Sequence, residues 1–157
     1  IHECFIAVPD LVDKYNLTPE AALQVGTQIH TAPEAFGKVM SMVKPKRAVA
    51  YHFWKDFNTS PGVYERVRST YDGPLSLAED FMVWNVTKEG IRERMAIIDE
   101  HTWNPPPAYP AEPVKAEDRV GYSPEIEAGR LDVDDVIKPI YEEASEALGR
   151  EFEYPTK

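Results

Sequence analysis

Three side chains of this 157-residue chain, Glu3, His30 and His52, could together bind a metal ion or transfer a proton. A carboxylate beside a histidine orients the imidazole and raises its basicity, and a neutral imidazole is the commonest protein ligand for metals. Glu3 stands near the start of an apolar segment, where an unpaired carboxylate is costly. A histidine partner would offset that cost, so these residue types predict a site for acid–base or metal chemistry.

His30 stands directly before residues 31–34 (TAPE), which fit a capping box with Thr31 as the N-cap and proline at the first helical position. The free N–H groups and the positive end of the helix dipole favour an anion there, such as phosphate, carboxylate or a developing oxyanion. We therefore expect His30 to donate to such an anion or to exchange a proton with it. Simple packing or capping at the helix start is the alternative.

His52 follows the apolar run at 47–51 (RAVAY), which is typical of a buried strand. In α/β sheets the functional residues gather where strands end, and a strand end holds an imidazole rigidly. We predict that His52 is a metal ligand, with a backbone-bonded, partly buried histidine as the alternative. Glu3, His30 and His52 each have such an ordinary explanation alone, but a scaffold has no need of all three.

Three further residues could belong to the site: Asp56, Trp54 and His101. Asp56 could approach the metal, although loop aspartates are commonly at the surface, and Trp54 could line a pocket for an apolar substrate. His101 could reach the pocket rim, with packing as the alternative. Trp84 is expected in the core. The acidic run 132–135 lacks the spacing of a calcium loop and is predicted to begin a helix.

The elements that must position these residues alternate between strand and helix, which favours a layered α/β arrangement. The predicted strands cover residues 1–8 and 47–54, and a β-hairpin covers 81–86 and 91–98, with its turn at 87–90. The predicted helices begin at the Thr18 cap, at 31 and running to 43, at 60 and at 131. Pro139 lies inside the last helix and is expected to kink or split it.

The chain divides into three predicted parts: a layered domain at 1–103, an extended arm at 104–130 and a helical segment at 131–157. The stretch 103–125 contains six prolines and little apolar periodicity, which is typical of a chain that runs extended over a surface. The arm is suited to wrapping a neighbouring subunit.

Composition limits the classes of partner. A net charge of −10 disfavours binding to a phosphate backbone, which needs clustered Lys and Arg, so we expect no nucleic-acid partner. No apolar run approaches the roughly 20 residues that span a bilayer, so we expect no membrane partner either. Small molecules and other proteins remain, and Cys4, the single cysteine, excludes an intrachain disulfide. The sequence identifies no compartment.

The segments IHEC (1–4), IHTAPEAFGKV (29–39) and KPKRAVAYHF (44–53), in this order, resemble the C-terminal part of a metallo-β-lactamase-fold hydrolase of the ribonuclease Z-like branch. In that branch a strand with a His-Glu pair precedes a His-Ser/Thr segment that opens a helix, and a strand ending in Thr-His supplies a metal ligand. The corresponding pairs here are His2-Glu3, His30-Thr31 and Tyr51-His52. The similarity covers residues 1–56 and continues through 74–86.

The resemblance implies half of a four-layer αβ/βα sandwich, with one sheet on each half and helices outside. It also implies two divalent ions, zinc before manganese or iron, with His52 as a ligand and with Glu3 and His30 as the catalytic pair. The family's main metal motif, His-x-His-x-Asp-His, is absent from this chain. We therefore expect the N-terminal half on a separate chain, which would also explain a sequence that begins at Ile1 without methionine.

The resemblance implies hydrolysis of a small phosphodiester, ester, lactone or sulfate-ester substrate by an activated water. Cys4-Phe5 after the glutamate, Tyr51 in place of threonine and the acidic charge all argue against a tRNA-processing member. The alternative function is a non-catalytic scaffold that keeps this fold for association, and an unrelated interaction domain is a third. A homo-oligomer is expected in either of the first two cases.

Overall fold

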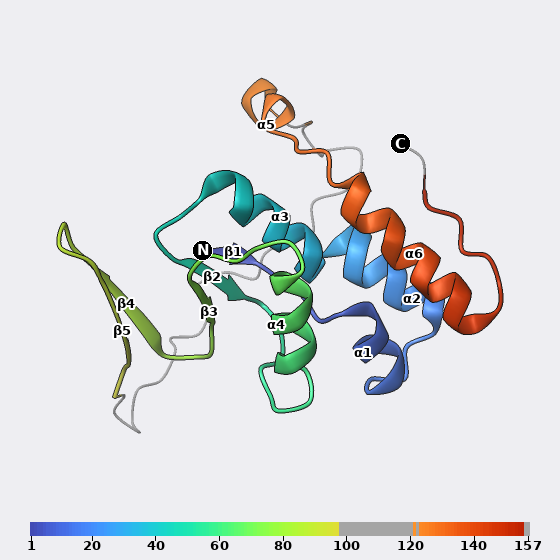
Figure 1. Ribbon diagram of the computed structural model, residues 1–157, viewed down its shortest axis with the longest axis horizontal. Helices are drawn as coiled ribbons and strands as arrows, with labels where there is room; N and C mark the ends of the chain where they lie inside the picture. The colour runs from blue at the N-terminus through green and yellow to red at the C-terminus, as the bar shows by residue number, and fades with distance from the viewer. Residues whose placement is uncertain (98–120, 122, 156–157) are drawn as a thin grey trace, which may run out of the picture.

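A computed structural model of the chain describes residues 1–97, 121 and 123–155, which form a mixed α/β structure. Its centre is a parallel three-stranded sheet in the order β1-β2-β3 (Figure 1). The strands are β1 (His2–Glu3), β2 (Ala48–Tyr51) and β3 (Leu75–Leu77). Glu3 is paired with Tyr51, and Ala50 is paired with both His2 and Leu77. The mixed α/β class is confirmed, whereas the half-sandwich remains an expectation.

Helices fill the connections, because parallel neighbours need long crossovers. Between β1 and β2 lie α1 (Val8–Asp13), α2 (Pro19–Leu23), the π-helix η1 (Gln24–Ile29) and α3 (Pro33–Val43). The remaining helices are α4 (Ser60–Arg68), α5 (Pro124–Ala128) and α6 (Asp134–Leu148). Among the described residues, none of the helices has the length and apolarity needed to cross a membrane.

The antiparallel hairpin of β4 (Met82–Val86) and β5 (Ile91–Met95) forms a separate sheet that projects from the body of the molecule (Figure 1). Its tight turn is as predicted, since Thr87 N–H donates to Gly90 O at 2.9 Å. Trp84 is partly exposed, so the expected core position is wrong. Its indole N–H instead donates to Glu93 across the hairpin at 2.8 Å.

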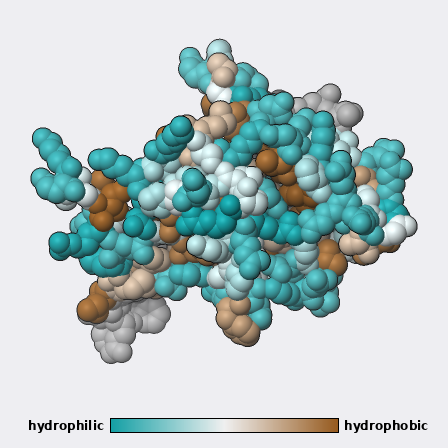
Figure 2. Space-filling model, viewed as in Figure 1, coloured by the Kyte–Doolittle hydropathy of each residue, from teal (hydrophilic) through white to brown (hydrophobic). Residues whose placement is uncertain are grey.

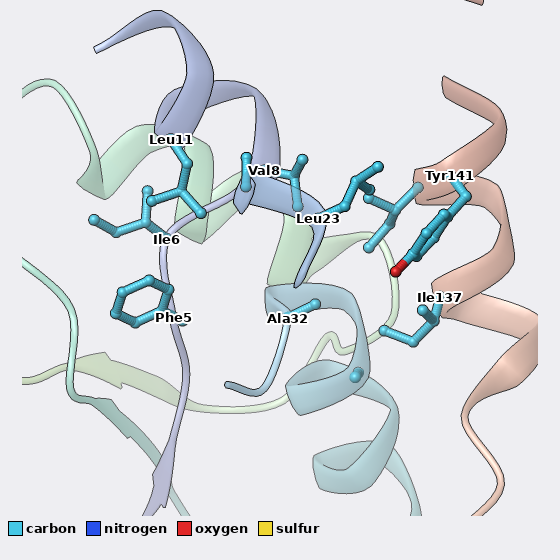
Figure 3. Packing of buried hydrophobic residues seen from close by; sticks show 11 residues of the cluster. Phe5, Ile6, Val8, Leu11, Leu23, Ala32, Ile137 and Tyr141 are labelled. Carbon is cyan, nitrogen blue, oxygen red and sulfur yellow. The ribbon is translucent and has the colours of Figure 1, made fainter. Parts of the chain in front are cut away.

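A first hydrophobic core joins the β1–α1 segment, α2 and α6 (Figure 3). Its largest fully buried members are Ile6 and Leu11, and Ile137, Ile140 and Tyr141 enter it from α6. Burial of a side chain of this size contributes about 1.5–3 kcal/mol. This core therefore holds the C-terminal helix, far away in sequence, against the N-terminal segment.

A second core lies between the sheet and the helices α3 and α4. Cys4 and Ala50 face Phe36, Val63 and other apolar residues of the two helices, and these four residues are fully buried. Burial raises the pKa of the Cys4 thiol well above its usual range, so the thiol is a packing group. This core fixes β1 and β2 relative to α3, whose N-terminal end lies next to the candidate site.

Outside the cores, the face seen in Figure 2 is mostly hydrophilic, in keeping with the high charge.

The predicted strand over residues 1–8 is wrong beyond Glu3. Residues 4–7 leave the sheet and α1 begins at Val8, with Pro9 in its first turn instead of closing a strand. An apolar run does not distinguish a buried strand from a short buried helix. Here β2 ends at Tyr51, the pairing partner of Glu3, so β1 has no further partner and its apolar residues turn into the first core.

Three other boundaries also differ from the prediction. α6 is one helix that contains Pro139, so the expected split does not occur, and the missing N–H removes one hydrogen bond from its second turn. Residues 124–128, expected in the extended arm, form α5, because Ser123 accepts a capping bond from Ile126 N–H. β2 ends before His52 and β5 at Met95, both short of the predicted ends. Residues 104–120 and 122 of the arm lie outside the described residues.

We predict that Gly37→Ala destabilises the protein. A Cβ at Gly37 would lie 2.1 Å from Thr70 Oγ1 and 2.7 Å from the backbone O of Val67, so α4 would have to move away from α3. Overpacking costs about 1–3 kcal/mol, which exceeds the gain of about 1 kcal/mol in helix propensity. Urea denaturation should show a lower free energy of unfolding than in the wild type. Gly90→Ala is the control because nothing lies within 4 Å of its added Cβ. Equal stability of wild type and Gly37→Ala would contradict the close contact.

We predict a pH-dependent contribution from Glu143 on α6, whose carboxylate accepts from Arg66 at 2.7 and 3.1 Å. These hydrogen bonds lower the pKa of Glu143. Its ionised form therefore stabilises the fold above the unfolded pKa of about 4.3, and the effect is lost as the pH falls through the lower folded value. Glu143→Gln should cost about 0.5 kcal/mol at pH 7, discounted for solvent screening, and nothing at acid pH. Glu142→Gln is the control; a loss that persists at acid pH would refute the assignment.

Candidate metal centre

The three residues singled out by the sequence, Glu3, His30 and His52, come together in the structure. One ligand atom from each lies within 4.8 Å of the others, although the residues belong to three segments of the chain. Glu3 ends β1, His30 follows η1 and His52 follows β2. Among the described residues, this is the one group of three or more His, Cys, Asp or Glu side chains close enough for a metal ion.

Backbone hydrogen bonds hold the three segments in place. Cys4 N–H donates to Tyr51 O at 2.8 Å, which closes the parallel pairing of β1 with β2 and fixes the approach to His52. Phe5 N–H donates to Thr31 O at 2.9 Å, which ties the end of β1 to the segment before α3. The site is therefore built on the sheet edge and a helix start.

The Glu3 carboxylate has partners for both of its oxygens. Oε2 lies 3.0 Å from His30 Nδ1, and Oε1 accepts from Thr31 N–H at 2.6 Å and from the Thr31 hydroxyl at 3.0 Å. Burial would raise the pKa of Glu3, but the bonds from His30 and Thr31 outweigh it and the pKa is lowered. Glu3 is thus an ionised group that orients His30, with little capacity left for direct metal ligation.

The predicted capping box at Thr31 is wrong. The N-cap of α3 is Ala32, which makes no side-chain cap, and the Thr31 hydroxyl donates to Glu3 instead. Glu34 does not reach back to the cap; its Oε1 accepts from Arg66 at 2.8 Å. The amide before the helix therefore binds an internal carboxylate, which is the anion that the helix start was predicted to favour.

His30 is fixed on two sides. Its ring stacks on Phe5 with centroids 4.1 Å apart and planes 18° from parallel, and Nδ1 is held by Glu3. Nε2 makes no hydrogen bond to the described part of the chain, which leaves that nitrogen for a ligand or substrate. The His52 ring lies next to it, with the two centroids 5.1 Å apart.

His52 has a left-handed backbone, with φ of 75°. This conformation is uncommon for a residue with a Cβ and tends to occur at functional sites. The His52 side chain is exposed, and its ring makes no hydrogen bond to any described residue. The turn after β2 thus presents an open imidazole beside the Glu3–His30 pair.

The ligand atoms, two imidazole nitrogens and one carboxylate oxygen, are of the kinds that bind a divalent metal ion. Two ligands of one zinc ion lie no more than about 4.2 Å apart, because each bond to nitrogen or oxygen is about 2.1 Å long. The 4.8 Å spread of this cluster therefore needs a small closure if all three residues bind one ion. Since Glu3 is already committed to His30 and Thr31, the geometry favours His52 as ligand, with His30 beside it.

The other predicted residues have different places. Asp56 lies outside the cluster, and its Oδ1 accepts from the backbone N–H groups of Asn58 and Thr59. These hydrogen bonds lower the pKa of Asp56, and the bond from the Thr59 N–H contributes most. Asp56 therefore stabilises the loop before α4. Trp54 is exposed and shares a groove with His52. His101 lies outside the described residues.

Three contributors were not predicted from the sequence: Phe5 beneath His30, Thr31 as a donor to Glu3, and Phe81 in the same groove as His52. An aromatic after a His-Glu pair and a hydroxyl after a histidine are weak signals that gain meaning only once the segments meet. For Phe81 the sequence offers none. No protein-family model matches this sequence, and a comparison with curated proteins likewise finds no match.

We predict that His52→Ala weakens binding of zinc to the intact chain by at least about tenfold, since even outer partners of metal ligands contribute this much. Calorimetric titration with zinc, and cobalt absorption as a second readout, would measure it. His2→Ala is the matched control, because the His2 ring contacts Phe36 and lies outside the cluster. Equal losses in the two variants would show that the ion binds elsewhere.

Proposed function

We propose that this chain is the C-terminal segment of a metal-dependent hydrolase of the metallo-β-lactamase type. The proposed substrates are small phosphodiesters, esters, lactones or sulfate esters. The observation that supports it is an ionised Glu3 bonded to His30 directly beside the exposed His52. A structural role alone does not explain why three separate segments bring these groups together in an accessible place.

In this proposal His52 holds one of two divalent ions, zinc or else manganese or iron. When bound, such ions supply an activated water and polarise the scissile group. The ligand set described here is too small for two ions. The remaining ligands would come from an N-terminal half on a separate chain, as the resemblance implies.

His30 acts on the leaving group or on the developing anion. Because Glu3 is ionised, it accepts a hydrogen bond from His30 Nδ1–H, which leaves Nε2 as the nitrogen available to the substrate. A protonated imidazole can donate from Nε2 to an oxyanion or to a departing alkoxide. The Phe5 ring, stacked on His30, keeps the imidazole in this orientation.

The first test is native mass spectrometry with metal analysis of the protein purified without chelators. We expect a second polypeptide of about 150–200 residues, the usual size of a domain, together with two bound ions. A chain that stays alone, folded and metal-free when zinc is supplied would refute the hydrolase and favour the scaffold, the second candidate.

We predict that His30→Ala in the assembled hydrolase lowers kcat by about 10²–10⁴, the usual contribution of general acid–base catalysis. Glu3→Gln should lower kcat less, by about tenfold, because His30 stays in place but loses its orienting charge. Nitrophenyl esters of acetate, phosphate and sulfate would give the rates, with metal content measured in parallel. Unchanged kcat in His30→Ala at full metal content would exclude the assigned role.

A further inference from the structure

A groove of about 750 Å³ opens directly beside His52. It lies between the loop that follows β2 and the loop that follows β3, and its aromatic lining includes Phe5, Tyr51, Trp54 and Phe81. Pockets for small molecules usually span about 300–1,000 Å³, so the space suits one substrate-sized group. The proposed hydrolytic site and this groove are continuous, because His52 lines the groove and belongs to the metal cluster.

Aromatic surface is exposed in this groove to an unusual degree. Tyr51 is 46% exposed, Trp54 56% and Phe81 58%; the first two come from the end of β2 and the loop after it, and Phe81 comes from the segment before β4. Single apolar side chains at a surface need no explanation, but a cluster of exposed rings in one concavity marks a binding surface.

The backbone holds two of the lining residues in an unfavourable conformation. His52 and Phe81 both line the groove and both have left-handed backbones, with φ of 75° and 69°. Such residues cost about 1–3 kcal/mol each and gather where function requires them. The Phe81 loop is nevertheless well fixed, since Phe81 O accepts from Ala96 N–H at 2.8 Å.

Trp54 is also held in position. Its ring packs against Tyr15 and Phe5, with centroids at 4.8 and 5.9 Å, and its carbonyl accepts from the buried hydroxyl of Thr59. A ring that is already supported from behind and open in front loses little freedom when a ligand stacks on it. The groove is therefore a preformed aromatic surface.

Charge decides between a neutral aromatic occupant and a cationic one. Lys55 and Glu79 line the groove and form an ion pair at 3.5 Å, and Asp80 adds one negative charge. A divalent ion at His52 would repel a cation in the same groove and would attract the anionic end of a substrate. A neutral ring is compatible both with the charges of the lining and with a divalent ion at His52, and it would stack on the exposed aromatic side chains.

We propose that this groove binds the aromatic group of an aryl ester-type substrate, with the scissile group at His52 and the ring between Trp54 and Phe81. The inference rests on the proposed hydrolase function, which it narrows from small esters in general to aryl esters. The specificity-determining residues are then Trp54 and Phe81, and neither takes part in the chemical step.

The first experiment needs neither metal nor activity. Naphthol is titrated into the intact chain, and the Trp54 indole and Phe81 ring signals are followed by NMR. We expect saturable shifts at both rings. Trp54→Ala and Phe81→Ala should each weaken binding by about fivefold, the contribution of one aromatic pair, whereas Trp54→Phe should bind nearly normally.

Phe57→Ala is the matched control, because Phe57 lies on the same loop and is 87% exposed but does not line the groove. Equal weakening by Phe57→Ala, or shifts confined to other parts of the protein, would overturn the proposal. So would binding of tetramethylammonium that is tighter than binding of naphthol, since the groove would then be a cation site.

A second pair of probes separates this inference from the function on which it rests. Phenylphosphonate and methylphosphonate are titrated into the zinc-loaded protein. We expect both to bind, the phenyl compound more tightly, with the advantage lost in Trp54→Ala. Equal affinities would overturn the aryl groove and leave the metal site standing. Naphthol binding without any zinc-dependent phosphonate binding would instead count against the hydrolase and support only the aromatic site.

Discussion

The Glu3 carboxylate is the group on which the arrangement of the site depends. One carboxylate accepts from His30, from the Thr31 amide and from the Thr31 hydroxyl, and so joins residues 27 and 28 positions apart. It fixes the imidazole through one oxygen and the start of the α3 segment through the other. The same interaction therefore stabilises the junction between β1 and α3 and gives His30 its orientation, which makes fold and proposed chemistry inseparable here.

The α3 helix begins with no side-chain cap of its own, because its N-cap is Ala32. An alanine in place of a capping residue costs about 0.5–2 kcal/mol. Glu3 offsets part of this loss by placing its negative charge beside the helix start, where it accepts from the Thr31 amide, and Pro33 has no N–H, so one fewer donor needs an acceptor. The charge that a local cap would have supplied is thus placed where it also acts on a histidine.

The elements with local sequence signals could be predicted from the sequence. α3, α4, the hairpin and α6 have their own periodicity, proline or turn residues, and they lie where expected to within a few residues. The length of a strand could not be predicted, because it depends on the pairing partner. β1 ends at Glu3 because β2 ends at Tyr51, and the apolar residues 4–8 then pack among helices. The meeting of Glu3, His30 and His52 was predicted from residue type, order and resemblance, whereas Phe5, Thr31 and Phe81 depend on contacts between distant segments.

The two left-handed residues of the groove, His52 and Phe81, indicate why the groove and the metal cluster form one surface. β2 and β3 are parallel neighbours, so the loops that follow them leave the same edge of the sheet. A chain that continued extended past Tyr51 would carry His52 along the strand, whereas a φ of 75° turns it out next to His30. Phe81 makes the corresponding turn before β4 and faces the same space. Backbone strain at two points thus brings an imidazole and an aromatic ring into the lining of one groove.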